Sequence, residues 1–332
     1  MPEALLAAPR PRRWREALRD AVRSPAELAA LLDLPPAAVA GAADPDFPLL
    51  VPRSFVARMR KGDPDDPLLK QVLPTAAESL RTPGYVADPV GEHGIAAGGV
   101  LQKYPHRALL IATAACPVHC RYCFRRAFPY SSQLASRDDF GPAVAALARL
   151  DDVREVILSG GDPLSLGNAR LGRLVERLEG VPSLRILRIH TRFPVMLPER
   201  VDEGLLALLR RTRLAKVVVL HCNHPNELDA EVAAAAAALR EAGATLLNQS
   251  VLLEGVNDDA DTLARLSERL FEAGVLPYYL HLLDPVQGAA HFDVPAARGL
   301  ELVAELRARL PGYLVPRLVR EDAGRLSKTP VA

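Results

Sequence analysis

Six short hydrophobic runs rich in β-branched residues recur from residue 108 onward, and helical periodicity follows each of them. The runs occupy residues 108–114, 153–161, 184–191, 215–222, 244–253 and 276–284. We predict the helices that follow them at residues 142–150, 169–179, 201–212, 227–242, 259–273 and 295–310. Continuous apolar strands that alternate with helices indicate parallel βα units in which both faces of the sheet are buried.

Polar residues follow five of these strands at their carboxyl ends, in the sequences SGGD, HTR, HCNH, NQS and LLD. Six βα units fit either an open doubly wound sheet or a barrel. The carboxyl rim of a (β/α) barrel carries its active site, so polar ends on all five strands favour a closed or nearly closed ring. Because six units are fewer than the eight of a full barrel, we predict an α/β fold with a partial, TIM-like (β/α)6 barrel.

The first hundred residues have a different pattern. Residues 12–22 and 24–34 have the periodicity of short amphipathic helices, and the second begins with a Ser-Pro capping signal. Proline-rich connections follow. We therefore expect a helical, proline-rich N-terminal extension over residues 1–100, the barrel over residues 101–320 and a C-terminal tail over residues 321–332.

The composition is that of a soluble globular enzyme, with 49% hydrophobic and 24% charged residues in 332. The net charge of +1 and the lack of a long basic tract argue against a nucleic-acid partner. The longest apolar run, at residues 232–239, is far shorter than the ~18 residues that a membrane span needs. The N-terminus has no secretory signal pattern, so we expect a cytoplasmic protein without a membrane partner.

Three of the four cysteines, Cys116, Cys120 and Cys123, lie within eight positions directly after the first predicted strand of the barrel. Clustered cysteines in a reducing compartment indicate metal or redox chemistry rather than disulfides. Three thiolates on a 4Fe-4S cluster leave one iron open, as a catalytic metal requires. The alternative is a structural zinc with a His or Asp as fourth ligand, although zinc sites usually consist of two paired knuckles. His119 lies inside the loop but would point elsewhere if its neighbours ligate, and the distant Cys222 could be a fourth ligand.

This C-x3-C-x2-C spacing, with the aromatic Tyr122 before its third cysteine, resembles the radical S-adenosylmethionine (SAM) superfamily. The resemblance implies a 4Fe-4S cluster on the three cysteines, whose open iron binds the methionine part of SAM. The SGGD segment resembles the glycine-rich stretch of that superfamily at the end of its second strand. The residues implied to contact SAM are Ser159, Gly160, Gly161, Asp162, His221 and Gln249.

Further segments resemble the lysine 2,3-aminomutases over roughly residues 50–330, namely CRYCFRR, HCNHPNEL, NQSVLLEGVND and GRLSKTP. This resemblance implies pyridoxal 5′-phosphate (PLP) as a second cofactor, with Lys328 in the tail as its Schiff-base lysine. The segment KYPHR matches a PLP-binding stretch of these enzymes. Lys103, Tyr104 and Arg107 are thereby implied to contact PLP.

The resemblance also implies the substrate contacts. Arg125 matches the family arginine that clamps the carboxylate of lysine, and a guanidinium suits that group geometrically. Asp284 matches one of two family aspartates that hold the distant ammonium, and Glu321 stands at the position of the other. The implied enzyme is an isomerase, an intramolecular aminomutase that converts (S)-α-lysine to (R)-β-lysine and needs an external electron donor.

The segment VPRSFVARMRKGDPDDPLLKQVLP resembles the shorter branch of this family, which serves translation elongation factor P. The chain also stops two residues after KTP, without the cysteine-bearing extension of the metabolic enzymes. We therefore expect β-lysine to be made for elongation factor P, to which a separate ligase attaches it. The alternatives are a metabolic aminomutase acting on lysine or glutamate, and a zinc-held scaffold without activity. The sequence leaves the oligomeric state open, a homo-oligomer included.

Overall fold

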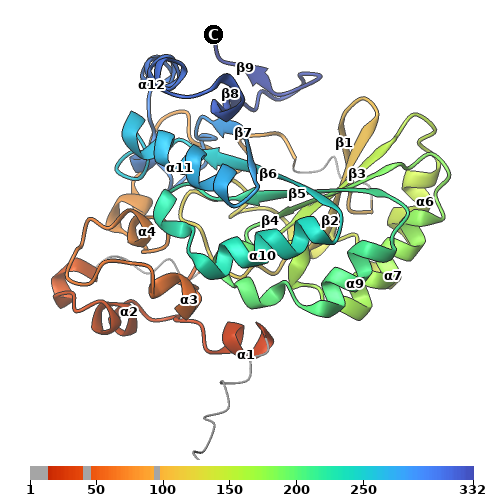
Figure 1. Cartoon of the computed structure of the whole chain (residues 1–332), viewed down its shortest axis with the longest axis horizontal. Helices are drawn as coiled ribbons and strands as arrows, with labels where there is room; N and C mark the ends of the chain where they lie inside the picture. Colours follow the sequence, from red (N-terminus) through yellow and green to blue (C-terminus); the bar gives the residue numbers. More distant parts are fainter. Residues whose placement is uncertain (1–13, 40–45, 93–97) are drawn as a thin grey trace, which may run out of the picture.

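The computed structural model describes residues 14–39, 46–92 and 98–332, and its centre is one sheet of nine strands (Figure 1). The strands lie side by side in chain order, and β2 to β8 are all parallel. In the described part of the chain β1 and β9 are the antiparallel edges, so the barrel is partial, as predicted. The strands are β1 (Val100–Tyr104), β2 (Arg107–Thr113), β3 (Glu155–Gly160), β4 (Ile186–Thr191), β5 (Ala215–His221), β6 (Ala244–Val251), β7 (Leu276–His281), β8 (Arg317–Arg320) and β9 (Thr329–Pro330).

Six helices alternate with the parallel strands, and all six were predicted. They are α6 (Gly141–Ala148), α7 (Asn168–Glu179), α9 (Glu203–Arg211), α10 (Ala230–Glu241), α11 (Ala260–Glu272) and α12 (Ala296–Arg309). Three of them begin after an aspartate whose side chain accepts a backbone N–H of the first turn, namely Asp202, Asp229 and Asp259. Among the described residues, no helix combines the length and the hydrophobicity of a transmembrane span.

Three strands lie outside the predicted pattern. β8 has four residues and β9 only two, which is too short for a hydrophobic period to be recognised. β1 forms a hairpin with β2 around His106, whose φ is +63°. These additions matter for the site, because β1 carries Lys103 and Tyr104 and β9 begins directly after Lys328.

Short helices make up much of the described N-terminal extension, as predicted. They are α1 (Trp14–Arg19), α2 (Pro25–Leu31), α3 (Arg53–Val56) and α4 (Pro67–Lys70), and the barrel adds α5 (Tyr130–Gln133) and α8 (Phe193–Met196). The hydrophobic cluster of the extension, which includes Leu28, Phe55 and Leu68, continues into the barrel through Val118 and Met196. Residues 1–13, 40–45 and 93–97 of the predicted extension lie outside the described residues, and its boundary at residue 100 stays a prediction.

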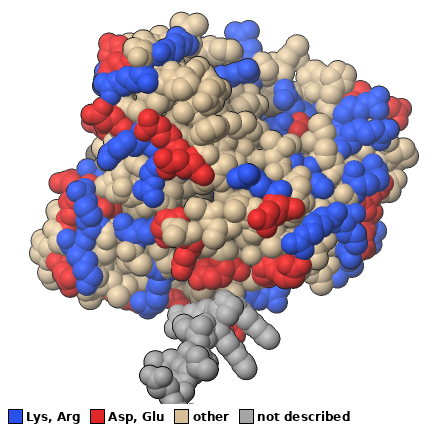
Figure 2. Space-filling model, viewed as in Figure 1, with Lys and Arg blue, Asp and Glu red and all other residues tan. Residues whose placement is uncertain are grey.

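Eight 3-10 segments complete the secondary structure of the described chain. They are η1 (Pro36–Val39), η2 (Ala76–Ser79), η3 (Arg137–Phe140), η4 (Pro163–Ser165), η5 (Pro198–Arg200), η6 (Pro225–Glu227), η7 (Ala290–Phe292) and η8 (Gly312–Leu314). On the face drawn in Figure 2, basic and acidic side chains are interspersed rather than gathered by sign. This mixture agrees with the net charge of +1.

Candidate active site

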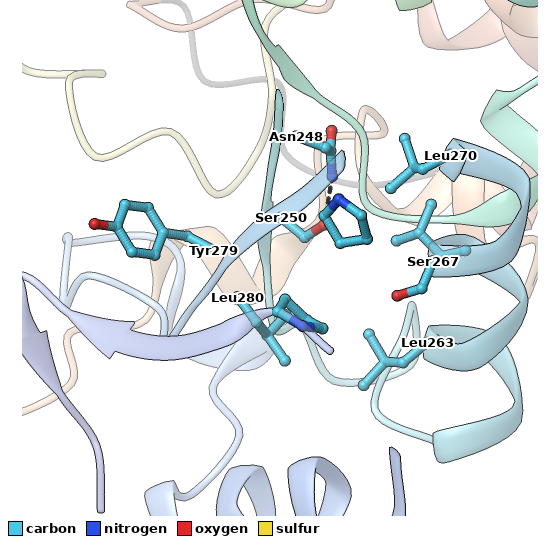
Figure 3. A pocket seen from close by; sticks show the side chains of 10 residues that line it. Asn248, Ser250, Leu263, Ser267, Leu270, Tyr279 and Leu280 are labelled. Carbon is cyan, nitrogen blue, oxygen red and sulfur yellow. Dashed lines mark hydrogen bonds between the residues drawn. The ribbon is translucent and has the colours of Figure 1, made fainter. Parts of the chain in front are cut away.

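The side chains of β6 show which face of the sheet carries the predicted site. Asn248 and Ser250 line a small cavity together with Leu263 and Leu270 of α11, outside the barrel (Figure 3). Successive side chains of a strand point to opposite faces, so Gln249 points from β6 into the barrel. The cavity of Figure 3 therefore belongs to the packing between sheet and helix, and the predicted site lies on the other face.

The cysteine loop, residues 114–126, follows β2 directly and carries Cys116, Cys120 and Cys123 as free thiols. Burial raises the pKa of Cys123 to about 11 and that of Cys116 well above its ordinary value, and the charges of the neighbouring thiolates add to both shifts. A bound metal centre would offset this cost, because ligation takes thiolates. The donor chemistry thus fits an iron–sulfur cluster.

The three cysteines remain a predicted ligand set. Among the described residues, no three His, Cys, Asp or Glu side chains are arranged to hold a metal ion as they stand. Both side chains considered above have other partners: His119 Nδ1 lies 2.7 Å from the carbonyl oxygen of Pro48, and Cys222 is fully buried and donates to the carbonyl oxygen of His224.

The N-terminal extension holds the cysteine loop in place. The backbone N–H of Arg121 donates to the carbonyl oxygen of Gln71 over 2.9 Å. The Arg121 side chain is fully buried and forms a two-bonded ion pair with Glu78, at 2.8 and 2.5 Å. Arg126 also pairs with Glu78, at 2.8 Å. The extension is therefore part of the wall around the cysteines rather than a separate appendage.

The glycines of the SGGD segment are explained by close packing against the cysteine loop. Gly160 has a φ of +116°, in the region that favours glycine. A Cβ on Gly161 would come within 2.5 Å of the carbonyl oxygen of Ala115, one residue before Cys116. The two glycines thus let the end of β3 approach the loop, whether or not they also contact SAM.

Neighbouring groups of the protein already form hydrogen bonds to the carboxylate of Asp162. Its buried carboxylate accepts hydrogen bonds from the Thr191 hydroxyl at 2.8 Å and from the backbone N–H groups of Arg192 and Leu164 at 2.7 and 3.0 Å. Burial nevertheless raises its pKa to about 6. Asp162 therefore fixes the ends of β3 and β4 at the rim, and its contact with SAM stays a prediction.

Alternating charges connect the predicted PLP lysine with the predicted substrate arginine. Lys328 Nζ lies 2.6 Å from Glu321, Glu321 lies 3.1 Å from Lys103, and Lys103 lies 3.4 Å from Glu92. Glu92 in turn binds Arg125 through two hydrogen bonds of 2.7 and 3.0 Å. Residues from both ends of the described chain thus meet at one rim.

Glu92 is the member of this series that the sequence analysis missed. Its side chain is only 4% exposed. Burial alone would raise its pKa, but Arg125 and Lys103 outweigh burial, and its pKa is lowered. Arg125 also donates to the Ser159 hydroxyl at 2.8 Å. Arg125, which is predicted to bind the substrate carboxylate, is therefore already paired with a carboxylate of the protein itself.

Arg107 is the residue best suited to an anionic group of a cofactor. Its guanidinium lies 4.7 Å from the centre of the Tyr104 ring, and its buried Nε has no hydrogen-bond partner among the described residues. The Tyr104 hydroxyl donates to Glu321 at 2.5 Å, and Lys103 is engaged by two carboxylates. The orphaned donor on Arg107 fits the phosphate of PLP.

Two carboxylates beside Lys328 differ in what they bind. Burial would raise the pKa of Glu321, but Lys328, Tyr104 and Lys103 lower it to about 2. Burial raises the pKa of Asp284 to about 7, and Lys328 and Lys103 only partly oppose this shift. The Asp284 carboxylate has no hydrogen-bond or ion-pair partner among the described residues, so it is the open anion of the site.

Neutral imidazoles line the interior below the rim. Burial lowers the pKa of His221 to about 3, and it lowers the pKa values of His190 and His281 well below their ordinary range. His221 Nε2 lies 3.4 Å from the Tyr122 hydroxyl, and the buried His190 Nε2 has no partner in the described part of the chain. His190 and His281 were not predicted, although His281 is the last residue of β7, as His221 is of β5, and His190 is the last but one of β4.

Comparisons of the sequence with known proteins point to one family. The family model of the radical SAM superfamily matches residues 110–266. The L-lysine 2,3-aminomutase of Escherichia coli is 47% identical over 321 residues, which are 96% of this chain and 94% of that protein. Those of Haemophilus influenzae and Clostridium subterminale are 44% and 33% identical, over 95% and 96% of this chain and 94% and 77% of theirs.

The solved structure of E. coli coproporphyrinogen III oxidase, a radical SAM enzyme, aligns with a TM-score of 0.42 and 15% identity. The alignment covers 71% of this chain and 57% of that one. This likeness is remote.

Proposed function

Because this chain belongs to the lysine 2,3-aminomutase family of the radical SAM superfamily, we propose that it isomerises (S)-α-lysine to (R)-β-lysine. One observation carries the substrate assignment. The guanidinium of Arg125, the amine of Lys328 and the carboxylate of Asp284 are neighbours at the rim. Together they would suit the carboxylate of a substrate, PLP and a distant ammonium, respectively.

Three groups of residues would hold the cofactors. Cys116, Cys120 and Cys123 would bind the 4Fe-4S cluster, Lys328 would bind PLP, and Arg107 would bind its phosphate. When bound, the cluster and SAM supply a carbon radical that abstracts hydrogen, and PLP supplies the π-bond that lets an amino group migrate. Ser159, Gly160, Gly161, Asp162, His221 and Gln249 are the proposed SAM contacts, with Lys103 and Tyr104 beside PLP.

The side chains of the rim would orient lysine between these groups. Arg125 would donate to the substrate carboxylate through the N–H that Glu92, Ser159 and Gly160 leave free, or in place of its bonds to Glu92. Asp284 would take the distant ammonium, since a cation removes the cost of keeping that buried carboxylate ionised. Glu321 is already bound to Lys103 and Lys328, so its share in the ammonium is the smaller one.

Glutamate fits this rim less well than lysine. Its far end is a carboxylate, which would face Asp284 and Glu321, and the neighbouring Lys103 and Lys328 are already paired with Glu321. Like charges in a buried site repel strongly. The acidic far end therefore favours a basic amino acid.

We further infer that the β-lysine is made for elongation factor P, where a separate ligase attaches it to the factor. The support is the resemblance of residues 51–74 to the branch of the family that serves this factor. A low-potential electron donor completes the proposed set of partners, since the cluster must be reduced before each radical is formed.

Anaerobic reconstitution with iron, sulfide, PLP, SAM and dithionite tests this proposal. Chromatography of the products should show β-lysine from (S)-α-lysine and none from glutamate. A Cys116→Ser variant prepared in parallel should give no product from either amino acid. If the reconstituted wild-type protein carries an iron–sulfur cluster but leaves lysine unchanged, the substrate assignment is wrong.

A further inference from the structure

Arg192, directly after β4, is a buried cation without a place in the chemistry proposed so far. It is 5% exposed. Its Nη1 donates to the sulfur of Cys120 at 2.7 Å and to the Tyr122 hydroxyl at 2.6 Å. Its Nη2 donates to Gln71 Oε1 at 2.7 Å and to Glu227 at 3.2 Å. One face of the guanidinium is therefore directed at a proposed ligand of the cluster.

Neighbours from distant parts of the chain hold this guanidinium in place. Gln71 from the N-terminal extension also accepts from Asn223 Nδ2 at 3.0 Å and donates to Glu227 at 3.0 Å. The ring of Phe55, from the same extension, lies 5.7 Å from the guanidinium carbon of Arg192. These contacts leave the arginine few other orientations, so its distance to the sulfur is fixed by the fold.

The guanidinium of Arg192 pairs with one carboxylate through Nη2 and directs its other nitrogen, Nη1, at the cysteine. A buried cation is costly unless it is paired, and Glu227 is the one carboxylate that Arg192 contacts among the described residues. Glu227 also accepts hydrogen bonds from the backbone N–H groups of Asn223 and His224, both at 3.0 Å. A thiolate on Cys120 would supply the second negative partner at 2.7 Å.

We infer that Arg192 sets the reduction potential of the cluster by donating a hydrogen bond, and presenting a fixed positive charge, to the Cys120 sulfur. This inference rests on the proposed function, since it requires the cluster on Cys120. Hydrogen bonds to ligand sulfurs and nearby charge are known determinants of cluster potentials. The step concerned is the uptake of one electron by the cluster, with an external one-electron donor oxidised and no bond made or broken in the protein.

The sign of the effect follows from charge. The reduced cluster carries one more negative charge than the oxidised cluster, and a fixed cation stabilises it more. Removal of the cation should therefore make reduction harder. Arg192 would act as a positioning residue that tunes the cluster, and not as a catalytic residue that touches the substrate.

Arg192→Gln in the full-length chain tests the inference, with Arg58→Gln as the matched control. Both arginines are buried, with side chains 6% and 8% exposed, and both lie over the ring of Phe55. Arg58 binds the backbone carbonyls of Glu227 and Val195 instead of a sulfur. The two variants thus remove the same type of group from neighbouring positions.

The readout is a redox titration of the reconstituted cluster, followed by electron paramagnetic resonance without SAM or lysine. At a fixed solution potential, Arg192→Gln should show at least a tenfold lower ratio of reduced to oxidised cluster, a shift of ~59 mV to more negative potential for one electron. Arg58→Gln should keep the wild-type ratio. Arg192→Lys, which keeps the charge but loses the fork, should lie between wild type and Arg192→Gln.

Two results would overturn the inference and leave the proposed function intact. One is a wild-type potential in an Arg192→Gln variant with full iron content, and the other is an equal shift in Arg58→Gln. If Arg192→Gln does not assemble a cluster, Gln71→Leu decides, because it removes an acceptor that orients Arg192: a negative shift supports the inference, and a wild-type potential refutes it. Absence of a cluster from the wild-type protein would instead refute the proposed function.

Discussion

The mouth of the barrel has two polar regions whose cations differ in their partners. We call the region of the cysteine loop and Arg192 the cysteine end, and the region of Lys328, Lys103 and Arg125 the amine end. Arg192, behind the cysteine loop, is bound by an amide, a phenol, a sulfur and a single carboxylate. Lys328, Lys103 and Arg125 at the amine end are each paired with Glu321 or Glu92, and Lys328 and Lys103 keep 24% and 16% of their side chains exposed. The cysteine end is therefore fixed by the fold, whereas the amine end holds cations in pairs that an incoming ligand can exchange.

This difference fits two kinds of ligand. A cluster that stays bound needs surroundings that do not rearrange, and the buried hydrogen bonds and ion pairs around the cysteine loop provide them. A substrate and a cofactor that bind and leave need buried cations that the protein itself pairs while the site is empty. Glu92 and Glu321 have this role at Arg125 and Lys328, respectively.

The largest expected effects are losses of activity, and they distinguish the cysteine end from the amine end by which reaction is lost. Cys120→Ser should abolish both the reductive cleavage of SAM and the conversion of lysine. Lys328→Ala should abolish lysine conversion but leave slow, uncoupled cleavage of SAM, because the cysteine end does not depend on PLP. Chromatography of 5′-deoxyadenosine and of β-lysine in the same reaction measures both. If Lys328→Ala loses SAM cleavage to the same extent as Cys120→Ser, the two ends are not independent.

The next largest effect concerns the stability of the paired cations. Glu92→Gln leaves the buried Arg125 without its carboxylate, which should cost about 3–5 kcal/mol of unfolding free energy. Glu203→Gln removes the partner of the exposed Arg210, at 2.6 Å, and should cost less than about 1 kcal/mol. Urea unfolding of the two variants provides the measurement. Equal losses would show that the pair at the rim is no stronger than a surface pair.

The pH dependence of stability should distinguish the two carboxylates beside Lys328. The pKa of Glu321 is depressed to about 2 from an ordinary 4.5, so its contribution of about 3 kcal/mol is complete above pH 4.5 and is lost as the pH falls towards 2. The pKa of Asp284 is raised to about 7 from 3.8, so it lowers stability progressively as the pH rises from about 4 to 7.

Single substitutions measure these two opposite pH dependences of the unfolding free energy separately. Glu321→Gln should be less stable than wild type at pH 6 and should approach wild type towards pH 2. Asp284→Asn should match wild type near pH 4 and exceed it at pH 7. Unfolding free energies across this range measure both, and parallel curves for wild type and variant would contradict the assigned pKa shifts.

The fold was predictable from the sequence wherever an element is long enough to show a clear hydrophobic periodicity. All six long helices and the strands they connect follow from alternating apolar runs, such as 215–222 for β5 (Ala215–His221). β8 and β9 were missed, because four and two residues carry no period of their own. They are held by pairing with neighbouring strands, β8 with β7 and β9 with β8, which no local pattern predicts.

The site was predictable only where a motif marks it. The cysteine spacing and the tail lysine could be located from their resemblance to a family. Glu92, Gln71 and Arg192 could not, since each is a single polar residue whose partner lies far along the chain, such as Asn223 for Gln71. No local pattern distinguishes a buried polar partner from a solvated side chain.

The smallest expected effect tests whether the amine end really leaves one anion open. Asp284→Asn keeps the shape of the side chain and removes the charge that would meet the ammonium of lysine, which should cost about 2 kcal/mol, roughly thirtyfold in kcat/KM. Asp261→Asn, on an exposed aspartate paired with Arg309, is the control and should leave kcat/KM unchanged. The loss should appear mainly in KM, because the ammonium is far from the migrating amino group and is bound alike before and during the reaction. An unchanged KM for the substrate would mean that Glu321 releases Lys103 and Lys328 and binds the substrate ammonium instead. The proposed difference between a paired Glu321 and an unpaired Asp284 would then be wrong.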